Sequence, residues 1–209
     1  MRFKDFYKII EKSKYYIFSY DDLALFCPGE GKSALKKMIY RWRKKGWIVS
    51  LKKGLYELTY PEDFNVPDMY AANKLYSPSY VSLETALSNY SIIPEVSMAV
   101  TSITTKTTRR FRNKHGLFLY HSIKPLAFTG YYVEKHGNFD ILIASPEKAL
   151  IDYLYFKAYR NRSFNPKDER LDKDALSRLK KKKLNQYAKL YGLSLKEFYA
   201  YLRVVDRTG

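Results

Sequence analysis

The sequence predicts an α+β fold of two parts. Within residues 1–60, three short segments with helical spacing of apolar residues precede two β-type segments. Beyond residue 67, helix signals mix with short runs of β-branched and aromatic residues, and the last 40 residues have helical character. Because 46% of the 209 residues are hydrophobic and 17% aromatic, the chain can bury a sizeable core.

The first two predicted helices are short. Apolar residues at i, i+3, i+6 and i+7 from Phe3 indicate a helix at the start of the chain. Ser19 is a suitable N-cap for a second helix, and the acidic residues Asp21 and Asp22 suit the positive end of its dipole. Pro28 and the following glycine end this helix, which leaves a short turn before the next one.

The third helix is the most clearly marked, and a hairpin follows it. It is predicted to begin at Lys32 or Ser33 and to end at Gly46, because glycine adopts the left-handed conformation that often follows a helix. Its apolar face, at i, i+3, i+4 and i+7, consists of Leu35, Met38, Ile39 and Trp42. Two β-type segments, 47–51 and 55–58, are joined by a Lys-Lys-Gly turn. Three helices and a hairpin within residues 1–60 are the layout of a winged helix-turn-helix domain.

Positive charge is concentrated in this predicted domain. The chain has 38 Lys and Arg against 21 Asp and Glu, a net charge of +17, and residues 32–53 contain nine Lys or Arg and no acid. Such a field attracts a polyanion, so nucleic acid, here double-stranded DNA, is the leading partner, and an anionic membrane surface is the second candidate. We expect the third helix in the major groove and the hairpin tip along the phosphates; the alternative is a solvated basic helix. The predicted DNA-binding residues are Lys32, Ser33, Lys36, Lys37, Tyr40, Arg41, Arg43, Lys44, Lys52 and Lys53.

Residues 61–67 are predicted to be a linker, since they hold two prolines and several polar residues. Residues 68–209 are then an α/β domain that ends in helices. Ser82 and Ser145 are expected to open helices, the second with Pro146 at its first position. The predicted strands of a mixed or antiparallel sheet are 96–103, 107–112, 116–121, 131–133 and 139–143. Near the end, Ser194 and Glu197 have the spacing of a capping box.

A second basic patch is predicted in this domain. It consists of Arg109, Arg110, Arg112 and Lys114, with Phe111 between the arginines. These residues could contact the DNA backbone, RNA or an acidic protein surface. They could also be a solvated strand edge whose charges oppose aggregation. The run of lysines at 180–183 is more typical of a solvated helix face.

Several functional classes find little support in the composition. The single cysteine, Cys27, excludes an internal disulfide, and three histidines are too few for a closed zinc site. No apolar run reaches the roughly 18 to 20 residues of a membrane span, so we expect a cytoplasmic protein. No cofactor is expected either. An enzyme is not expected. The rival interpretation is a DNA-processing enzyme with a nuclease-like second half, which Asp140, Glu147 and Lys148 suggest only weakly because adjacent helix residues do not project together.

Four segments of the second half carry a family resemblance. They are Ser-Leu-Glu-Thr-Ala-Leu at 82–87, Ile-Pro-Glu at 93–95, Thr-Ser-Ile-Thr-Thr-Lys at 101–106 and Ala-Ser-Pro-Glu-Lys-Ala-Leu-Ile-Asp at 144–152. Together they resemble the AbiEi family of abortive-infection antitoxins. The resemblance implies an operon repressor whose N-terminal domain binds inverted repeats in its own promoter. It also implies that the C-terminal domain counteracts a nucleotidyltransferase-like toxin in a type IV toxin-antitoxin system, in which the two proteins need not form a stable complex. A protein that is a monomer in solution could then place two copies on one operator.

Overall fold

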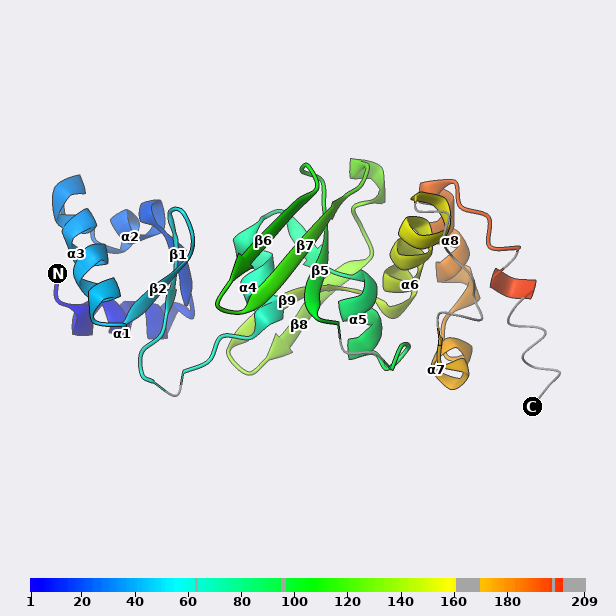
Figure 1. The fold of residues 1–209 in the computed structure, drawn as a ribbon, viewed down its shortest axis with the longest axis horizontal. Coiled ribbons are helices and arrows are strands. Elements are labelled where there is room, and N and C mark those ends of the chain that lie inside the picture. The colour runs from blue at the N-terminus through cyan, green and yellow to red at the C-terminus, as the bar shows by residue number, and fades with distance from the viewer. Residues whose placement is uncertain (63, 95–96, 161–169, 197, 201–209) are drawn as a thin grey trace.

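The computed structural model describes residues 1–62, 64–94, 97–160, 170–196 and 198–200. The fold is mixed α+β with two separate sheets, which confirms the predicted class. The molecule is elongated, with residues 1–60 at one end and the last helices at the other (Figure 1). None of the described helices has the length and apolar character needed to cross a membrane.

The N-terminal unit, residues 1–60, contains all of the elements predicted for it and one more. Its elements are α1 (Phe3–Ser13), β1 (Ile17–Ser19), α2 (Tyr20–Phe26), α3 (Lys32–Lys44), β2 (Ile48–Lys52) and β3 (Leu55–Leu58). The strands form an antiparallel sheet in the order β1-β3-β2. Strand β1 was not predicted from the sequence, because a run of three residues between two helices is too short to show an alternating pattern.

Local interactions in this unit follow the sequence signals. Ser19 caps α2 as predicted, and a capping box forms because Asp22 accepts the backbone N–H of Ser19 at 2.7 Å while the Ser19 hydroxyl accepts that of Asp22. Gly46 follows α3 with a φ of +70°, in the left-handed region that favours glycine. The apolar face of α3 packs inward, where Trp42 stacks on Phe6 with ring centroids 4.7 Å apart.

The second unit is built on a mixed sheet of six strands in the order β6-β7-β5-β4-β9-β8. The β5–β7 and β4–β9 pairs are parallel and the other pairs are antiparallel. Its elements are α4 (Asp68–Leu75), β4 (Ser79–Val81), α5 (Leu83–Asn89), β5 (Ala99–Thr104), β6 (Arg109–Asn113), β7 (Gly116–Ser122), η1 (Pro125–Ala127), β8 (Tyr131–His136), β9 (Phe139–Ala144), α6 (Pro146–Leu154), η2 (Tyr155–Arg160), α7 (Lys173–Ser177) and α8 (Lys181–Tyr191).

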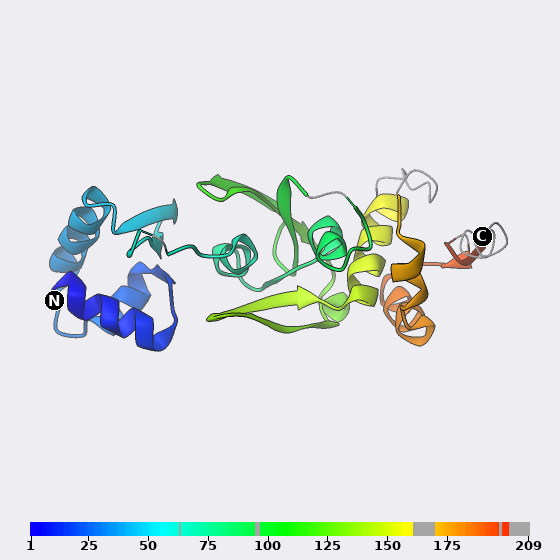
Figure 2. The same cartoon turned by 90° about the horizontal axis from the view of Figure 1, so that it is seen from below.

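Helices α4 and α5 lie between the β6–β7 end and the β8–β9 end of the curved sheet (Figure 2). Each of the five predicted strands overlaps an observed one, but β4 was not predicted, since its three residues are all buried and show no alternation. Ser145 caps α6 as expected, and Pro146 is its first residue. The predicted capping box at Ser194 involves Glu197, which lies outside the described residues.

The two units touch through aromatic side chains. Tyr16 of the N-terminal unit packs against Phe64 and Phe139, with ring centroids 4.6 Å and 5.2 Å apart. Where described, the segment 61–67 forms neither helix nor strand, yet its Val66 is completely buried. The segment predicted as a linker is therefore packed into the contact between the units.

Candidate nucleic-acid interface

Helix α3 separates apolar from cationic residues by the face on which they lie. Leu35, Met38, Ile39 and Trp42 are buried, with at most 6% of each exposed. The predicted DNA-binding residues on the helix are all exposed: Lys32, Ser33, Lys36, Lys37, Tyr40, Arg41, Arg43 and Lys44. Tyr40 is an exposed aromatic residue among these cations, with 67% of its surface accessible. The helix therefore presents a continuous surface of hydrogen-bond donors to solvent.

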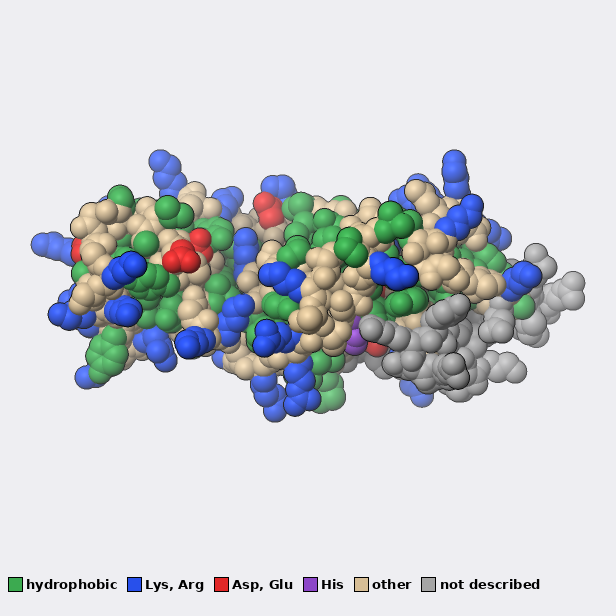
Figure 3. All heavy atoms as spheres, turned by 90° about the horizontal axis from the view of Figure 1, so that it is seen from above, with side chains coloured by type: hydrophobic (Ala, Val, Ile, Leu, Met, Phe, Trp, Pro, Cys, Tyr) green, Lys and Arg blue, Asp and Glu red, His purple; other side chains and the backbone are tan. Residues whose placement is uncertain are grey.

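The cations of α3 are not neutralised within the molecule. In the part of the chain that the structure describes, no ion pair involves a lysine or arginine of this helix. Glu30, just before the helix, is paired with the N-terminal amine of Met1. The face of the molecule seen in Figure 3 likewise shows many Lys and Arg side chains over both units and few acids. This surface can therefore receive phosphates without first breaking an internal salt bridge.

The two lysines of the hairpin turn differ from each other. Lys53 is exposed, as a contact to phosphate requires. Lys52, predicted to act beside it at a free tip, is turned toward the second unit, where its ammonium group donates to the Leu75 carbonyl at 2.6 Å. Burial lowers the pKa of Lys52, and the nearby charges of Lys106 and Arg109 lower it further. Lys52 is thus already engaged in the contact between the units.

Lys52 joins the hairpin to the second basic patch. Its ammonium group lies 5.4 Å from the ring centroid of Phe111, and the Arg109 guanidinium lies 6.0 Å from the same ring. Arg109, Arg110 and Arg112 are exposed on β6, which is an edge strand of the larger sheet. The hairpin and β6 therefore form one cationic surface across both units. Protection of the exposed edge of β6 from aggregation is a structural role that also accounts for the arginines.

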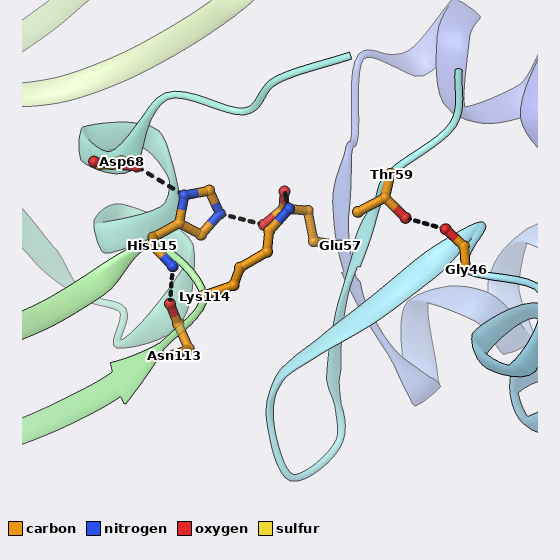
Figure 4. Close-up of polar contacts among 7 residues, drawn as sticks. All are labelled: Gly46, Glu57, Thr59, Asp68, Asn113, Lys114 and His115. Atoms are coloured by element: carbon orange, nitrogen blue, oxygen red, sulfur yellow. Dashed lines mark hydrogen bonds and ion pairs between the residues drawn. The ribbon is translucent and has the colours of Figure 1, made fainter. Parts of the chain in front are cut away.

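Lys114, at the end of the second basic patch, is exposed but has a partner in the N-terminal unit. Its ammonium group pairs at 2.7 Å with Glu57 of β3, a carboxylate with no exposed surface (Figure 4). His115 lies beside it, between two carboxylates: Nε2 is 2.5 Å from Glu57 and Nδ1 is 2.7 Å from Asp68. Lys114 and His115 thus join the two units, and Lys114 has a partner that the sequence pattern did not reveal.

The geometry around His115 favours the positively charged ring. A neutral imidazole has one N–H donor, so it can satisfy only one of the two carboxylates, whereas an imidazolium ion can donate to both. Burial lowers the pKa of His115, but the hydrogen bonds and negative charges of Glu57 and Asp68 outweigh it, so the pKa is raised above its ordinary value of 6.5. The contact is therefore strongest when the ring is protonated.

Glu57 and His115 were missed as functional candidates, although one signal was present. Glu57 is the only acidic residue between positions 31 and 60. Leu58, the next residue of β3, is also buried. The Glu57 carboxylate is held against the second unit by Lys114 and His115 and is not exposed on the basic face. A buried carboxylate needs a cationic partner, and here the second unit supplies that partner.

Two of the motif segments, 82–87 and 144–152, meet in a buried polar network. Asp152 of α6 accepts hydrogen bonds from Ser82 at 2.8 Å and from Tyr80 at 3.1 Å. Its other carboxylate oxygen pairs with Lys148, and the Tyr191 hydroxyl of α8 donates to the same oxygen. Burial lowers the pKa of Lys148, an effect that the charge of Asp152 opposes. Lys148 and Asp152 have no exposed surface. Through its hydrogen bonds, this network joins β4, α6 and α8 inside the second unit.

The residues of the nuclease interpretation have separate partners. Asp140 is mainly exposed and pairs with Lys135 at 3.4 Å, whereas Glu147 accepts the Lys180 backbone N–H at 3.3 Å. Lys148 is paired with Asp152, and both side chains of this ion pair are buried. Within the described ranges, no group of three or more His, Cys, Asp or Glu could hold a metal ion.

No protein-family model and no curated protein sequence matches this chain.

Proposed function

We propose that this protein is a DNA-binding transcriptional repressor and antitoxin, with residues 1–60 acting as a winged helix-turn-helix. The observation that carries the proposal is the exposed surface of α3, whose cations have no ion pair with the other described residues. A field of one sign, held on a rigid helix with a buried apolar face, suits the major groove of duplex DNA, which admits an α-helix.

The arrangement of elements supports this assignment. Helices α2 and α3 are joined by the short turn 27–31, and the antiparallel hairpin of β2 and β3 follows α3 directly. In a helix-turn-helix the second helix lies in the groove, so Lys37 and Arg41 are candidates to read base edges. Lys53 at the hairpin tip would contact phosphates, and the arginines of β6 would extend this contact along the backbone.

The antitoxin role rests on the resemblance to the AbiEi family. The motif residues Ser82, Lys148 and Asp152 are buried and bonded to one another, so they account for the fold of the second unit rather than for a partner surface. This is compatible with counteraction of a nucleotidyltransferase-like toxin without a stable complex. A repressor of its own promoter would act in the cytoplasm, as two copies on an inverted repeat.

A fluorescence-anisotropy titration tests the repressor role. The full chain is titrated against labelled duplex from upstream of its own gene and against a scrambled duplex, at several salt concentrations. We expect the native duplex to bind roughly 10³-fold more tightly, and log affinity to fall with log salt at a slope of about −5 or steeper. Equal affinity for both duplexes would reduce the basic face to a general polyanion-binding surface and overturn the repressor proposal.

Growth assays test the antitoxin role separately. A nucleotidyltransferase-like gene that overlaps or follows this one would be expressed alone and together with this protein. We expect growth arrest in the first case and recovery in the second, including when α3 carries Lys37→Ala and Arg41→Ala and the toxin is driven by an unrelated promoter. Failure to restore growth would remove the antitoxin role and leave DNA binding untouched.

A further inference from the structure

A groove lies on the N-terminal unit between α1 and the end of α3. It encloses a volume of about 760 Å³, within the range of small-molecule sites. Residues of α1 line one side, Arg41 and Lys45 line the other, and Trp47 and Tyr60 close it. Most of the cations proposed to contact DNA, such as Lys36 and Arg43, do not line it.

The inner surface of the groove is aromatic. Phe3 stacks on Trp47 with ring centroids 4.2 Å apart, and Tyr60 meets Phe3 edge-on at 5.6 Å. Tyr7 of α1 meets Tyr60 edge-on at 5.4 Å. Tyr60 is 42% exposed, and Tyr7 and Trp47 are half-buried. Ring surface of these side chains therefore remains open to a ligand that carries a planar π-system.

The rim of the groove is cationic. Lys8, Arg41 and Lys45 are exposed, and the described ion pairs include none of them. The one acid that lines the groove, Glu11, lies 3.3 Å from the Tyr7 hydroxyl, which donates to it. The Lys45 ammonium group lies 4.5 Å from the Trp47 ring centroid, so cationic and aromatic groups meet directly. A ligand that combines an aromatic ring with negative charge would complement both.

We propose that this groove binds a purine nucleotide, with the base against the aromatic side chains and the phosphate at the cationic rim. A purine nucleotide joins a large planar π-system to an anion, and its base can stack on aromatic side chains. The proposal does not depend on duplex binding by α3. Arg41 belongs to both surfaces, so an occupied groove would withdraw one cation from the DNA-binding helix.

Titration of the full chain with AMP tests the proposal, with tryptophan fluorescence as the signal and calorimetry as a check. Trp42 is only 4% exposed, so a change in fluorescence would mainly report on Trp47. Adenosine and inorganic phosphate separate the two halves of the ligand, and a short oligo-dA strand separates a free nucleotide from one within a nucleic acid. We expect saturable binding of AMP that is tighter than that of either half. AMP binding no tighter than phosphate would overturn the proposal.

Two variants test the location of this site. Tyr7→Ala removes one aromatic ring, and Lys45→Glu reverses one charge at an exposed position. Tyr7→Ala should weaken AMP binding at least about fivefold, in line with the loss of a stacking contact. Lys45→Glu should weaken it because a negative charge then lies at the rim where the phosphate is expected. Tyr40→Ala on α3 is the matched control, because it removes an exposed tyrosine that does not line the groove and should leave AMP affinity unchanged. Unchanged AMP affinity in Lys45→Glu and in a folded Tyr7→Ala protein would contradict the assignment.

Discussion

The lysines and arginines of α3 face solvent and form no ion pair with the described residues, whereas Lys52, Lys114 and His115 are bonded at the contact between the two units. Both regions are rich in positive charge, and by composition they would be assigned the same role. The difference is the presence of acceptors. Around α3 the described acids are few, while at the contact Glu57, Asp68 and the Leu75 carbonyl face the cations. Positive charge is most readily available to a ligand where the fold supplies no partner for it.

The largest expected effect comes from removal of the buried carboxylate. Glu57→Gln leaves Lys114 and His115 opposite a neutral group, and loss of one partner of a buried pair typically costs 3 to 5 kcal/mol. Because the Lys114 side chain is 36% exposed, we expect a loss of about 3 kcal/mol in the free energy of unfolding, measured by urea denaturation. Glu62→Gln, at an exposed position, is the control and should change stability by less than about 0.5 kcal/mol.

The next effect concerns α3 and should appear in DNA affinity rather than in stability. Arg41→Ala or Lys37→Ala should weaken binding to the native duplex by about 1 to 3 kcal/mol if the residue reads a base, and by less if it contacts a phosphate. A change in sequence preference would identify the base-reading residue. Lys12→Ala, which removes an exposed cation of α1, serves as the matched control for charge. Unchanged affinity in both α3 variants would contradict the role of this helix.

A smaller effect is expected from pH. The raised pKa of His115 means that its contribution to stability is complete below about pH 6.5 and is lost as the pH rises through the pKa of the folded state. The free energy of unfolding of the wild type, relative to His115→Gln, should therefore decline from pH 6 to pH 9. A constant difference across this range would mean that the ring is not protonated between its two carboxylates.

The smallest effect distinguishes the two lysines of the hairpin turn. Lys53→Ala should weaken all duplexes alike by a few-fold and reduce the salt slope by about 0.9, as loss of one phosphate contact requires. Lys52→Ala should in addition lower stability, because it removes the hydrogen bond to Leu75. If the two variants behave identically in denaturation, Lys52 does not serve the contact between the units.

The sequence predicted local structure better than it predicted partners. The α3 helix follows from the spacing of Leu35, Met38 and Ile39, and its end follows from Gly46, because these signals act between neighbouring residues. Strands β1 and β4 are too short to carry a periodic pattern. They form because neighbouring strands supply hydrogen bonds from distant parts of the chain.

The candidate site shows the same limit. Exposure of Lys36, Lys37 and Arg41 follows from the helical repeat, which sets the apolar face inward. The engagement of Lys114 depends instead on Glu57, 57 positions earlier, and that of Lys52 depends on a carbonyl in the second unit. Only the three-dimensional structure shows which cations have found an internal partner. The sequence also did not reveal the buried network of Lys148 and Asp152, since two of its members, Tyr80 and Tyr191, come from β4 and α8.

The salt dependence of DNA binding in two variants tests the central claim most directly. The slope of log affinity against log salt is measured for the wild type, for the double variant Lys36→Ala with Arg43→Ala, and for Lys114→Ala, with the native upstream duplex. If the unpaired cations of α3 meet phosphates, the double variant should lose about 1 to 2 from the magnitude of the slope, while Lys114→Ala should leave it unchanged. A loss in Lys114→Ala and none in the α3 variant would contradict the account.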